Sequence, residues 1–196
     1  MLAKSGLNLR NATLADMHIL AELESTSFPP DEAASLESMT KRCQHANPFF
    51  LVCFDSKAVP ETPILGFVNG TCSKFDVIHH ESMSSHDPAG KTLVIHSVTV
   101  SPALRRKGIG SALLRDYVHE MKQIKSLDQI LLLSKGYLLS FYTSCGFRIE
   151  RISPVQHGKV HINIQKYIFR FINSNNFWFH RNKLTGHLVR IKVGSK

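Results

Sequence analysis

The sequence predicts an α+β fold in which helices flank a mixed, mostly antiparallel central sheet. Two observations support this prediction: short β-branched and apolar runs of strand length recur along the chain, and segments with apolar residues at helical spacing lie between them. The 196 residues are enough for one domain with a substantial core. The chain shows no internal repeat and no apolar run long enough to span a membrane, so we expect no membrane partner.

The N-terminal part is expected to contain one strand and two helices. We expect the strand over residues 7–10 and the helices over residues 14–25 and 35–45. Thr13 followed by Asp16 is close to a capping box, which predicts the start of the first helix. The apolar stripe of that helix would consist of Leu14, Met17, Leu20, Ala21 and Leu23.

The rest of the domain is expected to alternate between strands and helices. Gly146 fits the position that follows a helix, where a left-handed backbone favours glycine. Helices are expected at 109–122 and 136–144, with a polar loop at 76–91. Apolar and β-branched runs predict strands at 49–54, 64–73, 92–100, 129–133 and 147–153.

The formal net charge of +9 is concentrated near the C-terminus. Up to Glu150 the chain has 15 Lys and Arg against 15 Asp and Glu, whereas residues 151–196 have nine basic residues and no acidic ones. We therefore expect no nucleic-acid partner for the folded domain. The basic end would be a solvated segment, with RNA, a membrane surface or ribosomes as alternative contacts.

The cysteines and the clustered histidines favour neither disulfides nor a metal site. No signal peptide precedes the cysteines and their spacing is not that of paired metal ligands, which predicts reduced thiols in a cytoplasmic protein at Cys43, Cys53, Cys72 and Cys145. Three histidines lie in a Ser/Asp/Pro-rich stretch: His79, His80 and His86. We interpret this stretch as a solvated loop and not as a metal site.

The strongest functional signal is a basic, glycine-containing turn between the strand at 92–100 and the helix at 109–122. Gly108 and Gly110 let the backbone approach a ligand closely, and the following helix directs its N–H groups and positive dipole end into the turn. A helix N-terminus of this kind favours an anion. Three basic side chains strengthen this preference: Arg105, Arg106 and Lys107. A P-loop is absent, and Leu113 stands where a dinucleotide fingerprint needs its third glycine.

The pattern Arg-x-x-Gly-x-Gly at 105–110 resembles the acyl-CoA pyrophosphate loop of the GCN5-related N-acetyltransferase (GNAT) superfamily. A second match is the Phe141-Tyr142 pair followed by Gly146-Phe147. Together with the stretch at 24–37 and the Ile-His-Ser-Val-Thr-Val run at 95–100, these motifs resemble the arylalkylamine (serotonin-type) N-acetyltransferase family. The resemblance covers residues 7–158 and is closest to the non-vertebrate, fungal and bacterial branch, whose members also accept polyamines.

The resemblance implies acetyl-CoA as cosubstrate and assigns roles to several residues. A protonated amine must lose a proton before it attacks, and by resemblance His96 takes that proton through water. Tyr142 matches the tyrosine that protonates the coenzyme A thiolate. Backbone groups of the strand would bind the pantetheine arm and thioester, and the turn would wrap the pyrophosphate; these positions are Val98, Thr99, Val100, Arg105, Arg106, Lys107, Gly108, Ile109, Gly110 and Ser111.

The base and the substrate stay open at this point. Glu32 or Asp31 is the rival base, and Val94 stands where vertebrate relatives carry a second histidine. The substrate loop is expected to include Phe28, Asp31 and Glu32. An apolar pocket wall would favour arylalkylamines, whereas an acidic wall formed by Glu24, Asp31 and Glu32 would favour polyamines.

The sequence therefore predicts a cytoplasmic, monomeric N-acetyltransferase that acts on a small primary amine, an arylalkylamine such as serotonin or tryptamine, or a polyamine. Within enzymes, the alternative is a protein or peptide N-terminal acetyltransferase. A catalytically impaired acyl-CoA-binding protein is a further alternative, and a basic nucleic-acid-binding protein comes last.

Residues 159–196 depart from the resemblance and are treated apart from the acetyltransferase domain at 1–158. They are basic and rich in Ile, Asn, Phe, Lys and Tyr, the residues that AT-rich codons encode. Our hypothesis is that they are translated non-coding sequence, in which alternating Ile162 and Ile164 could form a makeshift last strand. The alternative is a genuine basic appendage.

Overall fold

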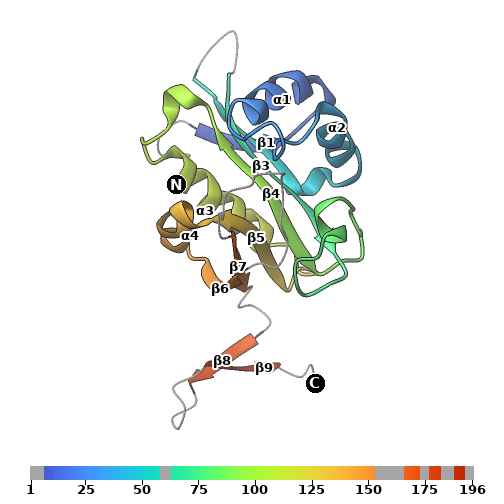
Figure 1. The fold of residues 1–196 in the computed structure, drawn as a ribbon, viewed down its shortest axis with the longest axis vertical. Helices are drawn as coiled ribbons and strands as arrows, with labels where there is room; N and C mark the ends of the chain where they lie inside the picture. The colour runs from blue at the N-terminus through green and yellow to red at the C-terminus, as the bar shows by residue number, and fades with distance from the viewer. Residues whose placement is uncertain (1–6, 58–62, 153–165, 173–176, 182–187, 193–196) are drawn as a thin grey trace.

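The computed structural model describes residues 7–57, 63–152, 166–172, 177–181 and 188–192 (Figure 1). Seven strands form one sheet in the order β1-β2-β3-β4-β5-β7-β6. Among these described strands only β4 and β5 pair in parallel, so the predicted α+β fold with a mixed, mostly antiparallel sheet is confirmed. The strands are β1 (Leu7–Asn11), β2 (Phe50–Asp55), β3 (Ile64–Ser73), β4 (Thr92–Val100), β5 (Gln129–Lys135), β6 (Arg148–Ile152) and β7 (Lys166–Ile172).

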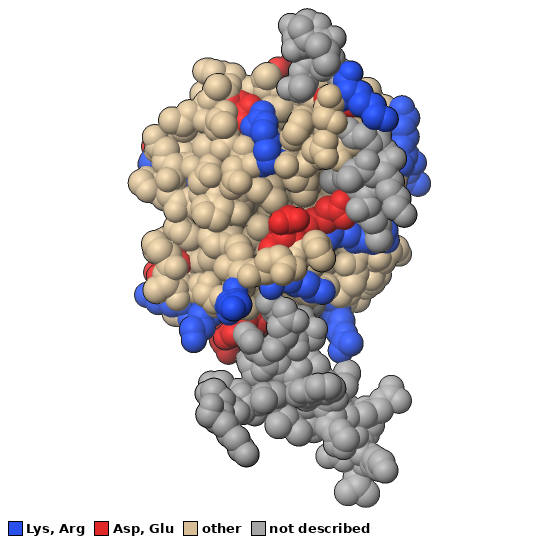
Figure 2. All heavy atoms as spheres, turned by 180° about the vertical axis from the view of Figure 1, so that it is seen from behind, with Lys and Arg blue, Asp and Glu red and all other residues tan. Residues whose placement is uncertain are grey.

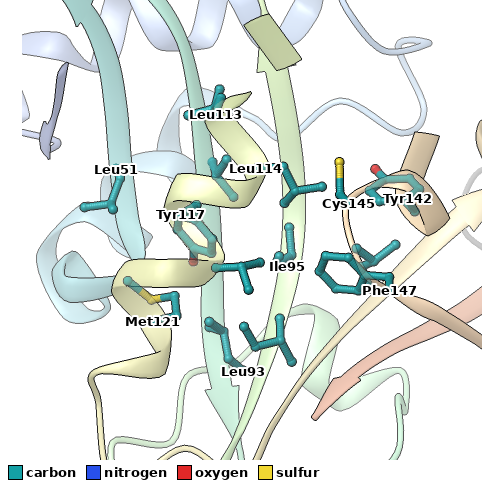
Figure 3. Packing of buried hydrophobic residues seen from close by; sticks show 14 of the residues in the cluster. Leu51, Leu93, Ile95, Leu113, Leu114, Tyr117, Met121, Tyr142, Cys145 and Phe147 are labelled. Atoms are coloured by element: carbon teal, nitrogen blue, oxygen red, sulfur yellow. The ribbon is translucent and has the colours of Figure 1, made fainter. Parts of the chain in front are cut away.

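The helices cover both faces of the sheet (Figure 1). On one face, α1 (Met17–Ser25) and α2 (Leu36–His45) bury apolar side chains such as Leu20 and Met39 against β2 and β3. On the other face lie α3 (Ile109–Lys122) and α4 (Leu139–Ser144). Figure 3 shows Leu113, Leu114 and Tyr117 of α3 packed against the sheet, where burial of such side chains stabilises the fold.

The first helix begins differently from the prediction. The capping box is present: the backbone N–H and the hydroxyl of Thr13 donate to Asp16 Oδ2 at 2.7 and 2.8 Å. A hydrogen bond from Arg10, at 2.7 Å, is the main cause that lowers the pKa of Asp16 to about 2. However, residues 14–16 form a 3₁₀ turn and α1 starts at Met17, so Leu14 is 54% exposed and does not belong to the buried stripe.

The sheet extends beyond residue 158. β7 pairs with β5 along its full length, from Gln129↔Ile172 to Lys135↔Lys166, and with β6 on its other side. The ring of Phe171 lies edge-on to Phe147, with centroids 5.6 Å apart, and Lys122 Nζ lies 4.5 Å from the Phe171 centroid. The predicted strand around Ile162 and Ile164 lies outside the described residues. β8 (Phe177–Arg181) and β9 (Leu188–Lys192) form a separate two-stranded sheet.

The helix predicted at 136–144 and the expected absence of a membrane-spanning segment can also be compared with the structure. The segment at 136–144 starts as a 3₁₀ turn and becomes α4 at Leu139. In the part of the chain that the structure describes, no helix has the length and apolar character needed to cross a membrane.

Candidate active site

A cleft opens where β4 and β5 separate. The two strands pair from Thr92↔Gln129 to Ile95↔Leu132, and beyond Ile95 the recorded pairs of β4 are with β3. The cleft has a volume of about 800 Å³. It lies between the α1–α2 loop, the C-terminal halves of β4 and β5, and α4, and its lining includes Phe28, Glu32, His96, Lys135 and Tyr142.

A β-bulge places His96 on the cleft side of β4. The pairs Asn69↔Ser97 and Gly70↔Ile95 leave His96 as the extra residue of β4, so the alternation of side chains changes there. Leu93 and Ile95, which precede the bulge, pack towards α3, whereas Ser97, which follows it, faces Glu24 of α1. His96 is half-buried, and its Nε2 lies 2.7 Å from Thr71 Oγ1, which fixes the orientation of the imidazole ring beside the cleft.

Tyr142 enters the same cleft from α4. Tyr142 is 8% exposed, and its ring lies edge-on to Phe147 (Figure 3), with centroids 6.1 Å apart, and to Phe141, with centroids 4.9 Å apart. Burial raises the pKa of the Tyr142 phenol above its ordinary value. The hydroxyl is therefore protonated at neutral pH, and it is a weaker acid than the hydroxyl of a solvent-exposed tyrosine. The structure thus brings both predicted catalytic residues, His96 and Tyr142, to one cleft.

The predicted anion-binding turn has the expected backbone. Gly108 is the N-cap residue of α3 at φ +80°, and Arg106 also has a positive φ of 63°. No atom lies within 4 Å of a Cβ added at Gly108, so the backbone angle, not crowding, favours glycine there. Arg106 and Lys107 are exposed around this open helix N-terminus. These residues fit a pyrophosphate, as the acetyl-CoA prediction requires.

Two other residues of the turn have additional contacts. A Cβ added at Gly110 would meet Phe141 and Val100 at 3.6 Å, an ordinary contact that the fold tolerates. Arg105 donates from Nε to the carbonyl oxygen of Val100 at 3.1 Å and from Nη2 to Ser27 Oγ at 2.8 Å. The Arg105 side chain thus connects the end of β4 to the segment that follows α1, while its two basic neighbours face solvent.

The side of the cleft formed by the α1–α2 loop and the end of β5 contains paired charges. Glu32 Oε2 lies 2.8 Å from Lys135 Nζ, and the two side chains are only 12% and 15% exposed. Asp31 is exposed, and Phe28 is half-buried. All three predicted loop residues line the cleft. Lys135 was not among the predicted site residues, because nothing in the sequence around it connects it to a loop about one hundred positions away.

Glu24 lies almost fully buried at the base of this loop. Its Oε1 accepts hydrogen bonds from the Ala34 N–H at 3.1 Å and from Ser97 Oγ at 2.8 Å. Desolvation raises the pKa of the carboxyl group, although these hydrogen bonds and the nearby Arg42 oppose the shift. Glu24 therefore joins α1, the loop and β4, and Arg42 is a second site residue that the sequence did not predict.

The histidine-rich loop and the cysteines have contacts that fit a structural role, and not metal binding or disulfide formation. His86 Nδ1 accepts a hydrogen bond from the Cys72 N–H at 3.0 Å, so His86 is more than a solvated loop residue. No group of three or more His, Cys, Asp or Glu side chains within the described ranges could hold a metal ion. All four cysteines are free and buried, and burial raises the pKa of Cys53 to about 11 and of Cys72 to about 12.

Two curated relatives are named serotonin N-acetyltransferase. The protein from Mesocricetus auratus is 28% identical over 88 residues, which cover 45% of this chain and 42% of that protein. The protein from Macaca mulatta is 25% identical over 116 residues, which cover 57% of each chain. The chain thus spans about half the length of the curated relatives it matches.

Two solved structures match this chain over nearly all of their own length. The loading GNATL domain of CurA from Lyngbya majuscula has a TM-score of 0.74 at 15% identity, covering 86% of this chain and 98% of that domain. The GphF GNAT-like decarboxylase, solved in complex with isobutyryl-CoA, has a TM-score of 0.71 at 21% identity, covering 85% and 99%. At these identities the likeness shows the fold alone.

The family assignment comes from a match over most of the chain. Residues 17–147 match the model of the acetyltransferase (GNAT) family. This range contains β2 to β5, the anion-binding turn, both predicted catalytic residues and the cleft between them. The chain belongs to the acetyltransferase (GNAT) family.

Proposed function

We propose that the protein transfers the acetyl group of acetyl-CoA to the nitrogen of a small primary amine, and that this amine is an arylalkylamine. The observation that carries the proposal is that His96 and Tyr142 line one cleft at the separation of β4 and β5. That cleft is adjacent to the end of β4, after which the chain enters the anion-binding turn.

The residues divide the proton transfers between them. Acetyl-CoA supplies an acetyl thioester, and in the reaction a C–N bond forms while the C–S bond breaks. The attacking ammonium first gives a proton, through water, to the imidazole of His96, which Thr71 orients. Tyr142 then gives its phenolic proton to the leaving thiolate, and the second proton that the nitrogen loses as the amide forms returns to the Tyr142 phenolate.

The charges of the cleft support a monoamine over a polyamine. Among the described residues that line it, the acids Glu24, Asp31, Glu32 and Glu37 are matched by Lys41, Arg42, Arg105 and Lys135. Two of these acids are in ion pairs, Glu32 with Lys135 and Glu37 with Lys41. The lining therefore does not form an acidic wall that could bind several ammonium groups. The names of the two curated relatives support the same choice.

Release of thiol from acetyl-CoA tests the proposal. Tryptamine, serotonin, phenylethylamine, spermidine and spermine are offered separately, with a short peptide bearing a free N-terminus as the comparison. We expect turnover with the aromatic amines and a much lower kcat/KM with the polyamines. Turnover with the peptide alone would replace the proposal by N-terminal acetylation, and binding of acetyl-CoA without turnover on any acceptor would replace it by a non-catalytic acyl-CoA-binding protein.

A further inference from the structure

The ion pair between Glu32 and Lys135 joins the two walls of the cleft. Glu32 comes from the loop after α1, and Lys135 is the last residue of β5, beyond the point where β5 separates from β4. Both side chains are largely buried, at 12% and 15% exposure, and both line the cleft that contains His96 and Tyr142. Solvent screens the attraction between two charges that are held away from water in this way less than it screens a surface pair.

Lys135, the partner of Glu32 in the ion pair, carries the same type of charged group as the proposed amine substrate. The Lys135 side chain ends in a primary alkylammonium group, 2.8 Å from the carboxylate oxygen. A polyamine carries several groups of this kind, whereas an arylalkylamine carries one. The pair therefore shows that Glu32 can bind a primary alkylammonium, and that Lys135 already occupies this position.

We propose that Lys135 is a specificity-determining residue, which neutralises Glu32 and so excludes polyamines from the cleft while monoamines are accepted. A second ammonium group of a polyamine would need to displace Lys135 or to lie beside it, and like charges at close range repel each other. A monoamine places its single nitrogen at the reacting end of the cleft and brings no further charge to Glu32. This inference rests on the proposed function for the choice of ligands.

The chain provides a matched control within the same cleft. Lys41 Nζ lies 2.7 Å from Glu37 Oε1, nearly the same separation as in the Glu32–Lys135 pair. Lys41 and Glu37 also line the cleft, but they are 66% and 77% exposed. Removal of either lysine charge changes the formal charge of the lining equally, so only the position and burial of the pair differ.

The test measures equilibrium binding of tryptamine and spermidine to the full chain in the presence of coenzyme A, by titration calorimetry. For Lys135→Gln we expect spermidine to gain about tenfold in affinity relative to tryptamine, the effect of one charge-assisted hydrogen bond. Lys41→Gln should leave the ratio within about twofold of that of the wild type, as exposed pairs do. The double variant Glu32→Gln/Lys135→Gln should return the ratio towards the wild-type value, because the acceptor carboxylate is then absent.

Three results would overturn the inference: an unchanged ratio in Lys135→Gln, an equal rise in Lys41→Gln, or a rise that persists in the double variant. If Lys135→Gln does not fold, Glu32→Gln provides the test. It leaves the Lys135 charge without this carboxylate and should weaken spermidine more than tryptamine, and an unchanged or reversed ratio would count against the inference. Because binding is measured, the test stands apart from catalysis: absence of acetyl transfer by the wild type would contradict the proposed function alone.

Discussion

The two sides of the cleft are held in place in different ways. The anion-binding turn at 105–111 takes its shape from local backbone angles, with Arg106 and Gly108 at positive φ directly before α3. The loop at 28–35, which we propose to face the acceptor, is held by contacts with distant segments: Glu32 pairs with Lys135 of β5, and the Ala34 N–H donates to Glu24, which also accepts from Ser97 of β4. The difference indicates that a short motif specifies the side proposed to bind the cofactor, whereas the acceptor side, proposed to bind the amine, depends on the tertiary fold.

The largest expected effect comes from removal of β7, which supports the acceptor side through β5. A chain that ends at residue 158 loses all the recorded pairs between β7 and its two neighbours and the packing of Phe171 on Phe147. We expect a loss of more than about 4 kcal/mol of stability, beyond that of most single core substitutions. The measurement is denaturant unfolding, with a chain that ends at residue 176 as the control.

That experiment also tests the hypothesis that residues 159–196 are foreign to the domain. If the chain that ends at 158 unfolds cooperatively with wild-type stability, β7 contributes nothing and the hypothesis gains support. If only the chain that ends at 176 is stable, the segment up to β7 belongs to the fold. The transcript sequence gives an independent answer, since a spliced message that encodes this segment would exclude retained non-coding sequence.

Substitutions in the turn should separate backbone conformation from ligand approach. Gly108→Val places a β-branched residue at φ +80° and should cost about 1–3 kcal/mol of stability, measured by thermal unfolding. Gly110→Ala should leave stability nearly unchanged, because the new Cβ makes ordinary contacts, but it should weaken acetyl-CoA binding if the backbone approaches the cofactor there. Equal acetyl-CoA affinity for Gly110→Ala and wild type would contradict a close approach at this position.

Glu24→Gln probes the acceptor side through pH. Desolvation raises the pKa of Glu24, so the protonated form is favoured in the folded state and the carboxyl group destabilises the fold as pH rises through its titration. The amide oxygen of glutamine can still accept from the Ala34 N–H and Ser97 Oγ. We expect the variant to gain stability relative to wild type as pH rises from 4 to 8, by less than about 1.5 kcal/mol. Melting temperatures that fall further behind wild type with rising pH would show that ionised Glu24 stabilises the fold.

The smallest effect is expected at the exposed pair. Lys41→Ala removes an ion pair whose two side chains are mostly in solvent. We expect no measurable change in melting temperature, because solvent screens such pairs. A clear loss of stability would show that exposure is a poor guide to the strength of the pairs around this cleft.

The local patterns of the sequence predicted much of the fold. The bounds expected for 64–73, 92–100 and 109–122 agree with β3, β4 and α3, because β-branched runs and helical apolar spacing are strongest there. On the face shown in Figure 2, the Asp and Glu of the described residues lie beside Lys and Arg within a largely uncharged surface. The Leu14 prediction failed because periodicity alone does not distinguish a 3₁₀ turn from the first turn of an α-helix.

The parts that the sequence did not predict depend on pairing between distant segments. The bulge at His96 exists only in the register of β3 against β4, and it sets which side chains of β4 face Glu24. The Glu32–Lys135 pair requires the loop and β5 to meet across the cleft. The motifs that single out Gly108 and Tyr142 need no such information, since each consists of residues adjacent in the chain, and the roles assigned to both residues stay predictions.

The most direct test of the central claim compares turnover with cofactor binding in the double variant His96→Ala/Tyr142→Phe. Thiol release with tryptamine gives kcat, and titration calorimetry gives the Kd for acetyl-CoA. We expect kcat to fall by at least about a hundredfold, as loss of acid–base groups does, while the Kd for acetyl-CoA stays within about threefold of wild type. Turnover that survives in a correctly folded variant would contradict the assignment of the cleft between β4 and β5 as the active site.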